Sequence, residues 1–201
     1  MRGILVAAGV LAALAGGVSA AAEPRTAVFA GGCFWCGESD FDKVPGVLDT
    51  VSGYTGGTVE SPTYEQVTYG DTGHYEAVEV TYDPDLVGYG ELVDIFWRTV
   101  DPTDAGGQFC DRGDSYRTAV FVADQSELQA AQASKSEAEA ALDREIVTPI
   151  VEAGAFWPAE EYHQNYYEKN PLQYRFYRWN CGRDDRLKKL WGDAAHQGPQ
   201  S

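Results

Sequence analysis

The apolar positions of the chain follow two different periods, which divide it into strands and helices. Runs of β-branched and aromatic residues that end in glycine or proline predict strands, and the clearest alternation is EAVEVTYDP. The predicted strands are residues 25–32, 47–57, 76–84, 115–123 and 147–154. Apolar residues three and four apart predict helices over residues 33–44, 89–100, 126–146 and 159–170, with Ser126 as an N-cap and Pro171 as a stop.

This order of elements suits an α+β domain. Strand, helix, strand, strand, helix and strand come first, and a helix, a strand and a coil-rich C-terminal tail from about residue 171 follow. The order predicts a two-layer ferredoxin-like sandwich, in which helices cover one face of a mostly antiparallel sheet. The sequence shows no repeats and no linker, so we expect a single domain over residues 25–192.

The first 20 residues follow a pattern of their own. Arg2 precedes an apolar run from Ile4 to about Leu14, and small residues end the segment at Ala20. This layout predicts a secretory signal peptide over residues 1–20 rather than a membrane anchor, because glycines interrupt the run and it is short for a membrane span. We therefore expect an exported protein, periplasmic or extracellular, with no membrane association in its mature form.

Charge and cysteine content narrow the possible functions. The formal net charge of the chain is -16, so the phosphates of a nucleic acid would be repelled and we expect no nucleic-acid partner. The chain has four cysteines, which in an exported protein could form two structural disulfides. The local context of each cysteine has to decide between a structural and a chemical role.

The stretch GGCFWCGE, residues 31–38, carries the strongest chemical signal. Cys33 follows a predicted strand and opens a predicted helix, where free backbone N–H groups and the helix dipole favour an anion. This position predicts a lowered thiol pKa and a nucleophile near neutral pH. Cys36 follows one helical turn later, close enough to form a disulfide with Cys33.

A C-x-x-C pair alone can be redox-active, structural or half of a zinc site. A zinc site needs a second pair of ligands, and Cys110 and Cys181 stand alone, so we expect no metal. A thioredoxin-like domain normally has small or polar residues and a proline between its two thiols. Phe34 and Trp35 stand there instead and indicate an apolar pocket beside the sulfur.

Five blocks of the sequence, taken in order, resemble the peptide methionine sulfoxide reductase A family. They run from about Ala27 to Pro171 and read GGCFWCGE, VSGYTGG, GDTGHYEAVEVTYDP, FCDRGDSYRTAVF and EEYHQNYYEKNP. The resemblance implies a thiol-dependent reductase that converts methionine-S-sulfoxide, free or in proteins, to methionine. It also implies a thioredoxin-like reductant as partner and no metal or organic cofactor.

The resemblance implies roles for the residues around the first thiol. Cys33 matches the family's catalytic cysteine, whose thiolate attacks the sulfoxide sulfur. Phe34 and Trp35 match the aromatic residues that hold the S-methyl group of the substrate. This role explains why two large aromatic side chains stand between two thiols, because an aromatic wall can bury the apolar group next to the reacting sulfur.

Four further residues match polar positions of the family. Glu76 matches the acid that protonates the sulfoxide oxygen, which requires burial to raise its pKa; without the resemblance it would be interpreted as a solvent-facing strand residue. Tyr54 and Tyr116 match the two tyrosines that hydrogen-bond that oxygen. Asp111 matches an acidic position that contacts the backbone amide of the substrate.

The identity of the thiol that resolves the Cys33 sulfenic acid stays open. Many relatives carry glycine at the position of Cys36 and recycling cysteines in a glycine-rich tail, whereas the tail cysteine here, Cys181, lies among charged and aromatic residues. We favour Cys36 as the resolving cysteine, with Cys181 and Cys110 as alternatives. In this favoured scheme Cys110 and Cys181 form a structural disulfide, and a thioredoxin-like donor reopens the catalytic one.

Two other functions are compatible with the residues taken alone. A thiol-disulfide oxidoreductase would use Cys33 and Cys36 on protein cysteines and would not need Glu76. A non-catalytic secreted binding domain would hold all four cysteines in disulfides and would contain no reactive thiol.

Overall fold

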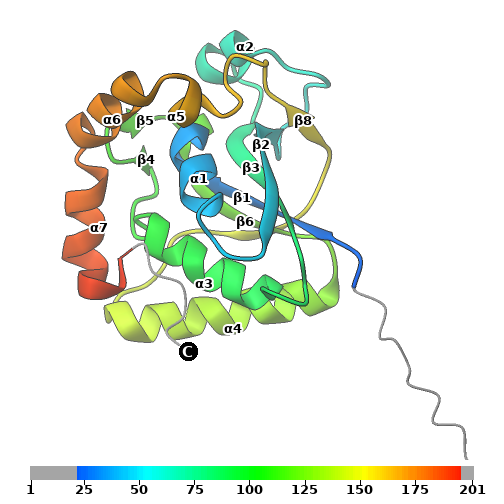
Figure 1. The fold of residues 1–201 in the computed structure, drawn as a ribbon, viewed down its shortest axis with the longest axis vertical. Helices are drawn as coiled ribbons and strands as arrows, with labels where there is room; N and C mark the ends of the chain where they lie inside the picture. Colours follow the sequence, from blue (N-terminus) through cyan, green and yellow to red (C-terminus); the bar gives the residue numbers. More distant parts are fainter. Residues whose placement is uncertain (1–21, 196–201) are drawn as a thin grey trace, which may run out of the picture.

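The computed structural model describes residues 22–195, whose helices and strands are drawn in Figure 1. They include one six-stranded sheet with the strand order β7-β6-β1-β3-β2-β8. The strands of this sheet are β1 (Arg25–Gly31), β2 (Val47–Thr55), β3 (Tyr75–Tyr82), β6 (Thr118–Val122), β7 (Ile150–Glu152) and β8 (Phe156–Pro158). A separate two-stranded ribbon consists of β4 (Gly107–Gln108) and β5 (Asp111–Arg112). The predicted signal peptide, residues 1–20, lies outside the described residues.

The sheet is antiparallel except at one edge. The strand pairs β1/β3, β1/β6, β2/β3 and β2/β8 are antiparallel, and β6/β7 is parallel. Side chains of a strand alternate between the two faces, so Val78, Val80 and Tyr82 of β3 enter the main core, whereas Tyr75 and Ala77 join a smaller apolar cluster. The α+β class and the mostly antiparallel sheet are thus confirmed.

Seven α-helices pack around this sheet in the described part of the chain. They are α1 (Phe34–Phe41), α2 (Tyr64–Tyr69), α3 (Tyr89–Thr99), α4 (Gln125–Leu142), α5 (Tyr166–Lys169), α6 (Pro171–Asn180) and α7 (Arg183–Trp191). The helical spacing of Leu92, Phe96 and Trp97 in α3 places these side chains in the main core, and Ala131 of α4 joins them. Figure 1 shows α5, α6 and α7 following one another along the side of the molecule next to α1.

The prediction of a coil-rich tail from about residue 171 is wrong, because α6 and α7 make most of this segment helical. Pro171 was interpreted as a stop for the preceding helix, but it occupies the first turn of α6, where proline is well tolerated. The buried side chains of Tyr174 and Leu187 are separated by charged residues, which obscured the apolar period. The helices are stabilised by docking onto the domain rather than by a strong pattern of their own.

Smaller differences concern element ends and short elements. The N-cap of α4 is Asp124, whose carboxylate accepts hydrogen bonds from Ser126 N at 2.8 Å and Glu127 N at 2.9 Å, so the prediction of Ser126 as the cap is wrong. The predicted helix over residues 159–170 is reduced to turns followed by α5. Strand β8 was not predicted; it pairs with the open edge of β2 opposite Gly53.

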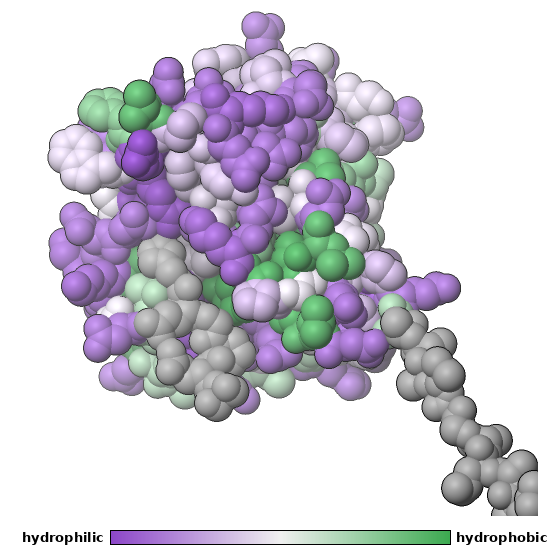
Figure 2. Space-filling model, viewed as in Figure 1, coloured by the Kyte–Doolittle hydropathy of each residue, from purple (hydrophilic) through white to green (hydrophobic). Residues whose placement is uncertain are grey.

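The surface agrees with the acidic composition. Figure 2 shows a mainly hydrophilic face on which a smaller group of apolar side chains gathers near the starts of β2 and α3, where Leu48 and Leu86 are exposed. Among the described residues, none of the helices combines the length and the apolar character that crossing a membrane requires.

Candidate active site

The junction of β1 and α1 presents the two thiols. Gly32 has a φ of +80°, and a Cβ there would lie 2.5 Å from Cβ of Gln108, so the turn into α1 requires glycine. Cys33 is the N-cap of α1, and its carbonyl accepts the amide of Cys36 at 3.1 Å. Both cysteines are free and buried. The predicted strand-to-helix position of the C-x-x-C pair is therefore observed.

The ionisation of the pair differs from the expectation. Burial raises the pKa of Cys33 well above the ordinary thiol range, and Cys36 and Glu76 act in the same direction. The hydrogen bond with Cys33 lowers the pKa of Cys36 to about 7, with Arg183 and Arg178 adding to the effect. The prediction of a lowered pKa at Cys33 is wrong for this state, since desolvation and nearby negative charge outweigh the helix dipole. The pair shares one readily lost proton, and the resulting charge lies on Cys36.

Glu76 lies beside this pair. It projects from β3 to the same side as Val78, is 2% exposed, and its Oε2 accepts the backbone amide of Phe34 at 3.1 Å. Burial raises the pKa of Glu76 to about 8, so the carboxyl group is mostly protonated at neutral pH. The interpretation of Glu76 as a solvent-facing strand residue is excluded, and a buried acid stands at the N-terminus of α1.

Tyrosines lie close to Glu76. Tyr54 pairs with Glu76 across β2 and β3, and its hydroxyl donates to Oε2 of Glu160 at 2.9 Å. The Tyr116 hydroxyl hydrogen-bonds Glu76 and lies 3.5 Å from the hydroxyl of Tyr64. Burial raises the pKa values of Tyr54 and Tyr116, so both remain protonated donors. The structure thus brings both predicted tyrosines to the acid.

The two aromatic residues between the thiols join a larger aromatic cluster. The Phe34 ring is buried, with its centroid 5.9 Å from Tyr54 and 4.9 Å from His163. Trp35 stacks on Tyr166 at 3.7 Å and donates through Nε1 to Nδ1 of His163 at 3.1 Å. This hydrogen bond orients the indole, and the cluster forms an apolar wall next to Cys33.

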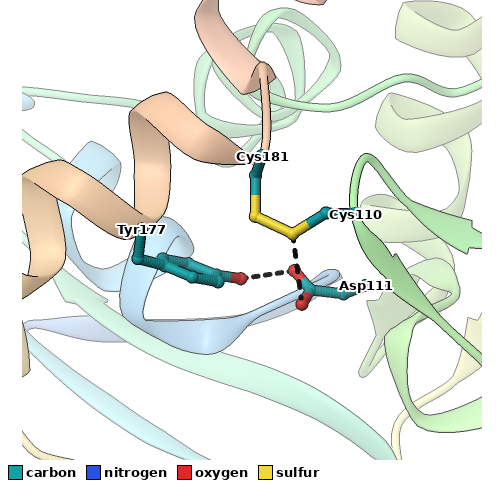
Figure 3. The surroundings of a disulfide bond; sticks show 4 residues. All are labelled: Cys110, Asp111, Tyr177 and Cys181. Carbon is teal, nitrogen blue, oxygen red and sulfur yellow. Dashed lines mark hydrogen bonds between the residues drawn. A yellow bond between two sulfur atoms is a disulfide. The ribbon is translucent and has the colours of Figure 1, made fainter.

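Asp111 approaches the site from β5 and carries a partner from the C-terminal segment. Figure 3 shows the Tyr177 side chain of α6 directed at the Asp111 carboxylate, and the hydroxyl donates to Oδ2. Cys110, directly before Asp111, forms a disulfide with Cys181. Burial raises the pKa of Asp111. The Cys110–Cys181 disulfide of the favoured scheme is thus present, and it links the β4–β5 ribbon to the end of α6.

A buried charge cluster acts on Cys36. Nη1 of Arg178 is 2.8 Å from Oδ1 of Asp40, and Nε of Arg183 is 3.9 Å from Oδ2 of the same carboxylate. Arg183 is 2% exposed and donates to the carbonyls of Thr99 at 2.7 Å and Gly31 at 3.3 Å. Both cations come from the C-terminal segment, which therefore controls the charge around Cys36.

One cluster in residues 22–195 has the composition of a metal site. One potential ligand atom from each of Cys110, Asp111 and Cys181 lies within 4.8 Å of the others. The two sulfurs are bonded to each other, however, and a disulfide does not offer the thiolate ligands that a soft metal requires. The cluster as it stands does not fit a metal ion.

Sequence reasoning missed the residues that complete the site from a distance: Tyr64, Glu160, Tyr177, Arg178 and Arg183. A capping box of Thr63 and Gln66 starts α2 and could have identified the helix that carries Tyr64. Tyr177, Arg178 and Arg183 stand in a charged stretch that gave no periodic signal, and Glu160 lies in the predicted helix over residues 159–170, which assigned it no role. Their contacts in the site span 66 to 152 residues of sequence, from Tyr177 with Asp111 to Arg183 with Gly31.

Comparisons with known proteins agree with this geometry. The family model for peptide methionine sulfoxide reductase (PMSR) matches residues 25–195. The chain is 56% identical over 178 residues to the peptide methionine sulfoxide reductase MsrA 2 of Rhizobium meliloti (strain 1021), a match that covers 89% of each chain. It is similar to the crystal structure of reduced Mxr1 from Saccharomyces cerevisiae, with a TM-score of 0.71 and 33% identity, over 74% of this chain and 87% of that one. The complex of Mxr1 with Trx2 matches with a TM-score of 0.52 and 26% identity, over 71% and 84% of the respective chains.

Proposed function

Because the chain belongs to the peptide methionine sulfoxide reductase family, we propose that it reduces methionine-S-sulfoxide to methionine with Cys33 as the nucleophile. The resemblance found in the five sequence blocks is confirmed at the level of the family. One observation carries the mechanism: Cys33 opens α1, and the next amide in the chain binds the buried acid Glu76 at 3.1 Å. Nucleophile and proton donor therefore meet at one helix terminus.

The reaction needs a thiolate at Cys33 and a proton for the sulfoxide oxygen. The hydrogen bond between the thiols lets the Cys33 proton pass to the Cys36 thiolate, so Cys36 serves as the base. The Cys33 thiolate attacks the sulfoxide sulfur while protonated Glu76 donates to the oxygen. Methionine leaves with its sulfur reduced, and Cys33 is oxidised to a sulfenic acid.

The second half of the cycle forms a disulfide. The Cys36 sulfur attacks the sulfur of the Cys33 sulfenic acid, the S–O bond breaks and one water leaves. A dithiol reductant then opens the Cys33–Cys36 disulfide by exchange and takes up the two oxidising equivalents. The direct hydrogen bond between the two thiols supports Cys36 over Cys181, whose sulfur is bonded to Cys110.

The remaining predicted residues bind and orient the substrate. Tyr54 and Tyr116 carry protonated hydroxyls beside Glu76 that serve the developing charge on oxygen, and Tyr54 does so by turning its single proton away from Glu160. Phe34 and Trp35 wall the position of the S-methyl group, and Asp111 accepts the backbone amide of the substrate.

A thioredoxin-like protein is the reductant that we propose for this cycle. The complex of the similar Mxr1 with Trx2 supports a partner of this kind. Both sulfurs of the catalytic pair are buried, at 6% and 1% exposure for Cys33 and Cys36, so their disulfide must become accessible before exchange. A donor that docks over the site and displaces part of the covering segment satisfies this requirement.

The test is turnover of a peptide carrying either the S or the R epimer of methionine sulfoxide. Dithiothreitol and a thioredoxin system are used separately, with wild type, Cys33→Ser and Cys36→Ser. We expect the S epimer alone to be consumed, no activity in Cys33→Ser, and activity in Cys36→Ser with dithiothreitol only. No turnover by wild type with either reductant would contradict the proposal and favour the thiol-disulfide oxidoreductase, whereas full thioredoxin-driven turnover by Cys36→Ser would move resolution to Cys181 or Cys110.

Export and the finer fold assignment belong to the same proposal. Arg2, the apolar run and the small residues before Ala20 support a signal peptide that directs the domain of residues 25–192 out of the cytoplasm. N-terminal sequencing of the protein recovered from a cell fraction outside the cytoplasm tests this, and an intact Met1 would contradict cleavage.

The strand order β6-β1-β3-β2, with α1 and α3 as connections, supports a ferredoxin-like core.

A further inference from the structure

Tyr177 touches both ends of the candidate site although no sequence block includes it. Its hydroxyl donates to the Asp111 carboxylate and also lies in hydrogen-bonding contact with the Cys33 sulfur, where it favours the thiolate. Its ring lies edge-on to Trp35, with the centroids 5.7 Å apart. One side chain of α6 therefore contacts the nucleophile, the aromatic wall and the acid that we assign to the substrate backbone.

The Cys110–Cys181 disulfide holds Tyr177 in this place. Cys181 follows Tyr177 by four residues and its amide donates to the Tyr177 carbonyl at 2.9 Å, so the two side chains lie on the same helical face. The other cysteine of the disulfide, Cys110, directly precedes Asp111 in the sequence. The same covalent bond thus restrains the hydroxyl donor and its carboxylate acceptor, as Figure 3 shows.

We propose that Tyr177 is a positioning residue of the reductase site: its hydroxyl orients the Cys33 sulfur and the Asp111 carboxylate, and the Cys110–Cys181 disulfide holds it there. The inference rests on the proposed function, because it assigns Tyr177 to that same site. A hydroxyl has one proton to donate. While Cys33 is a thiol, the proton goes to Asp111; when Cys33 becomes a thiolate, the same hydroxyl can turn its proton to sulfur and release the carboxylate for the substrate amide.

Other groups also face the Cys33 sulfur and affect its pKa, so an experiment on Tyr177 has to take them into account. Cys36 comes from α1, Glu76 from β3, Tyr64 from α2 and Tyr116 from the turn before β6, and all of them interact electrostatically with Cys33. The Tyr177 hydroxyl is the group that lowers the pKa of this thiol, against burial and the other neighbours. Replacing Cys36 by serine removes the strongest coupling and leaves a single titrating thiol.

The experiment measures the pH dependence of Cys33 alkylation by iodoacetamide in the Cys36→Ser protein, with peptide mapping by mass spectrometry. Tyr177→Phe is compared with Tyr167→Phe, a matched control in which the lost hydroxyl donates to Asp42 at 2.8 Å and interacts with Asp42 and Glu168 rather than with the thiols of the site. We expect the midpoint of Tyr177→Phe to rise by about one pH unit, which is a roughly tenfold lower rate below the midpoint. Tyr167→Phe should keep the midpoint of its parent.

The disulfide is tested in the same background by Cys110→Ser/Cys181→Ser, which leaves Tyr177 intact. We expect its midpoint to rise as well, because α6 is no longer held at the site. Greater access of the reagent would raise the plateau rate, and better solvation of Cys33 would lower the midpoint, because burial raises the pKa of this thiol. A rise in the midpoint therefore reports lost positioning rather than simple uncovering.

The outcomes separate this inference from the proposed function. An unchanged midpoint in Tyr177→Phe overturns the role of the hydroxyl, and a shift in Tyr177→Phe without one in the double serine variant overturns the role of the disulfide. Dithiothreitol-driven turnover of the sulfoxide peptide by wild type is measured alongside: its absence refutes the reductase, while the alkylation midpoints still report on Tyr177. Thermal unfolding checks that each variant folds, and the double serine variant keeps the test informative should Tyr177→Phe be unfolded.

Discussion

The two cysteine pairs of this protein stand in opposite environments. Cys33 and Cys36 are one helical turn apart, buried and free, with an acid, tyrosines and two arginines around them. Cys110 and Cys181 are 71 residues apart in sequence, lie nearer the surface and are bonded to each other. Spacing in the sequence does not explain the contrast, since a C-x-x-C pair can be structural. Burial and neighbouring charge set the ionisation of one pair, whereas the other pair connects distant segments.

A single turnover without reductant is the strongest test of the contrast between the two cysteine pairs. With one equivalent of sulfoxide peptide and no added reductant, we expect the two free thiols to disappear together and a Cys33–Cys36 disulfide to form. The Cys110–Cys181 bond should remain unchanged, because its sulfurs take no part in the cycle. Non-reducing peptide mapping identifies the linkages, and a Cys33–Cys181 linkage would show that the peripheral pair is catalytic after all.

Removing the proton donor tests what burial contributes to the reactive pair. Glu76→Gln keeps the shape and the amide contact but cannot give a proton to the sulfoxide oxygen, so we expect kcat/KM to fall by roughly 10²- to 10³-fold. The wild-type rate should also decline as pH rises through about 8, because Glu76 then loses its proton. The control is Glu79→Gln, three residues further along β3 and half-buried, with its side chain on the opposite face. Equal activity of the two variants across the pH range would contradict the assignment.

Opening the peripheral disulfide should affect folding more than chemistry. In the chain-entropy view, a cross-link that closes 71 residues of sequence stabilises the native state by ~4 kcal/mol. We expect Cys110→Ser/Cys181→Ser to lose stability of this order in urea unfolding, whereas Cys36→Ser should lose much less because its thiol is free. The comparison fails if the two variants are equally destabilised.

The last expected effect is the part of the pH dependence of stability that Glu76 contributes. The folded pKa of Glu76 is raised to about 8 from an ordinary value near 4.5, so its favourable contribution is fully present below about 4.5 and is lost as pH rises to 8. Relative to Glu76→Gln, the wild type should therefore become progressively less stable over this range. Urea unfolding of both proteins at pH 5 and pH 9 measures the difference. A constant difference would rule out the perturbed pKa, and the disulfide should contribute equally at both pH values.

The local sequence pattern was sufficient to predict the elements whose conformation depends on residues close to them in the sequence. The alternation in β3 predicts a strand, and the glycine-to-cysteine junction after β1 predicts a helix N-terminus with two thiols one turn apart. The five blocks predicted the family, because motif residues are read directly from their order along the chain. These features depend on neighbours within a few residues.

Only the tertiary structure decided the rest. Helices α6 and α7 exist because Tyr174, Arg183 and Leu187 are buried against the domain, and a charged sequence gives no sign of where that surface lies. The direction of the Cys33 pKa was mispredicted for the same reason. The helix dipole can be inferred from sequence, but desolvation and the charge of Glu76, 43 residues away along the chain (76 − 33), arise only when the chain has folded around the thiol. Long-range burial and charge are properties of the assembled fold, and they determine how the residues named by the sequence behave.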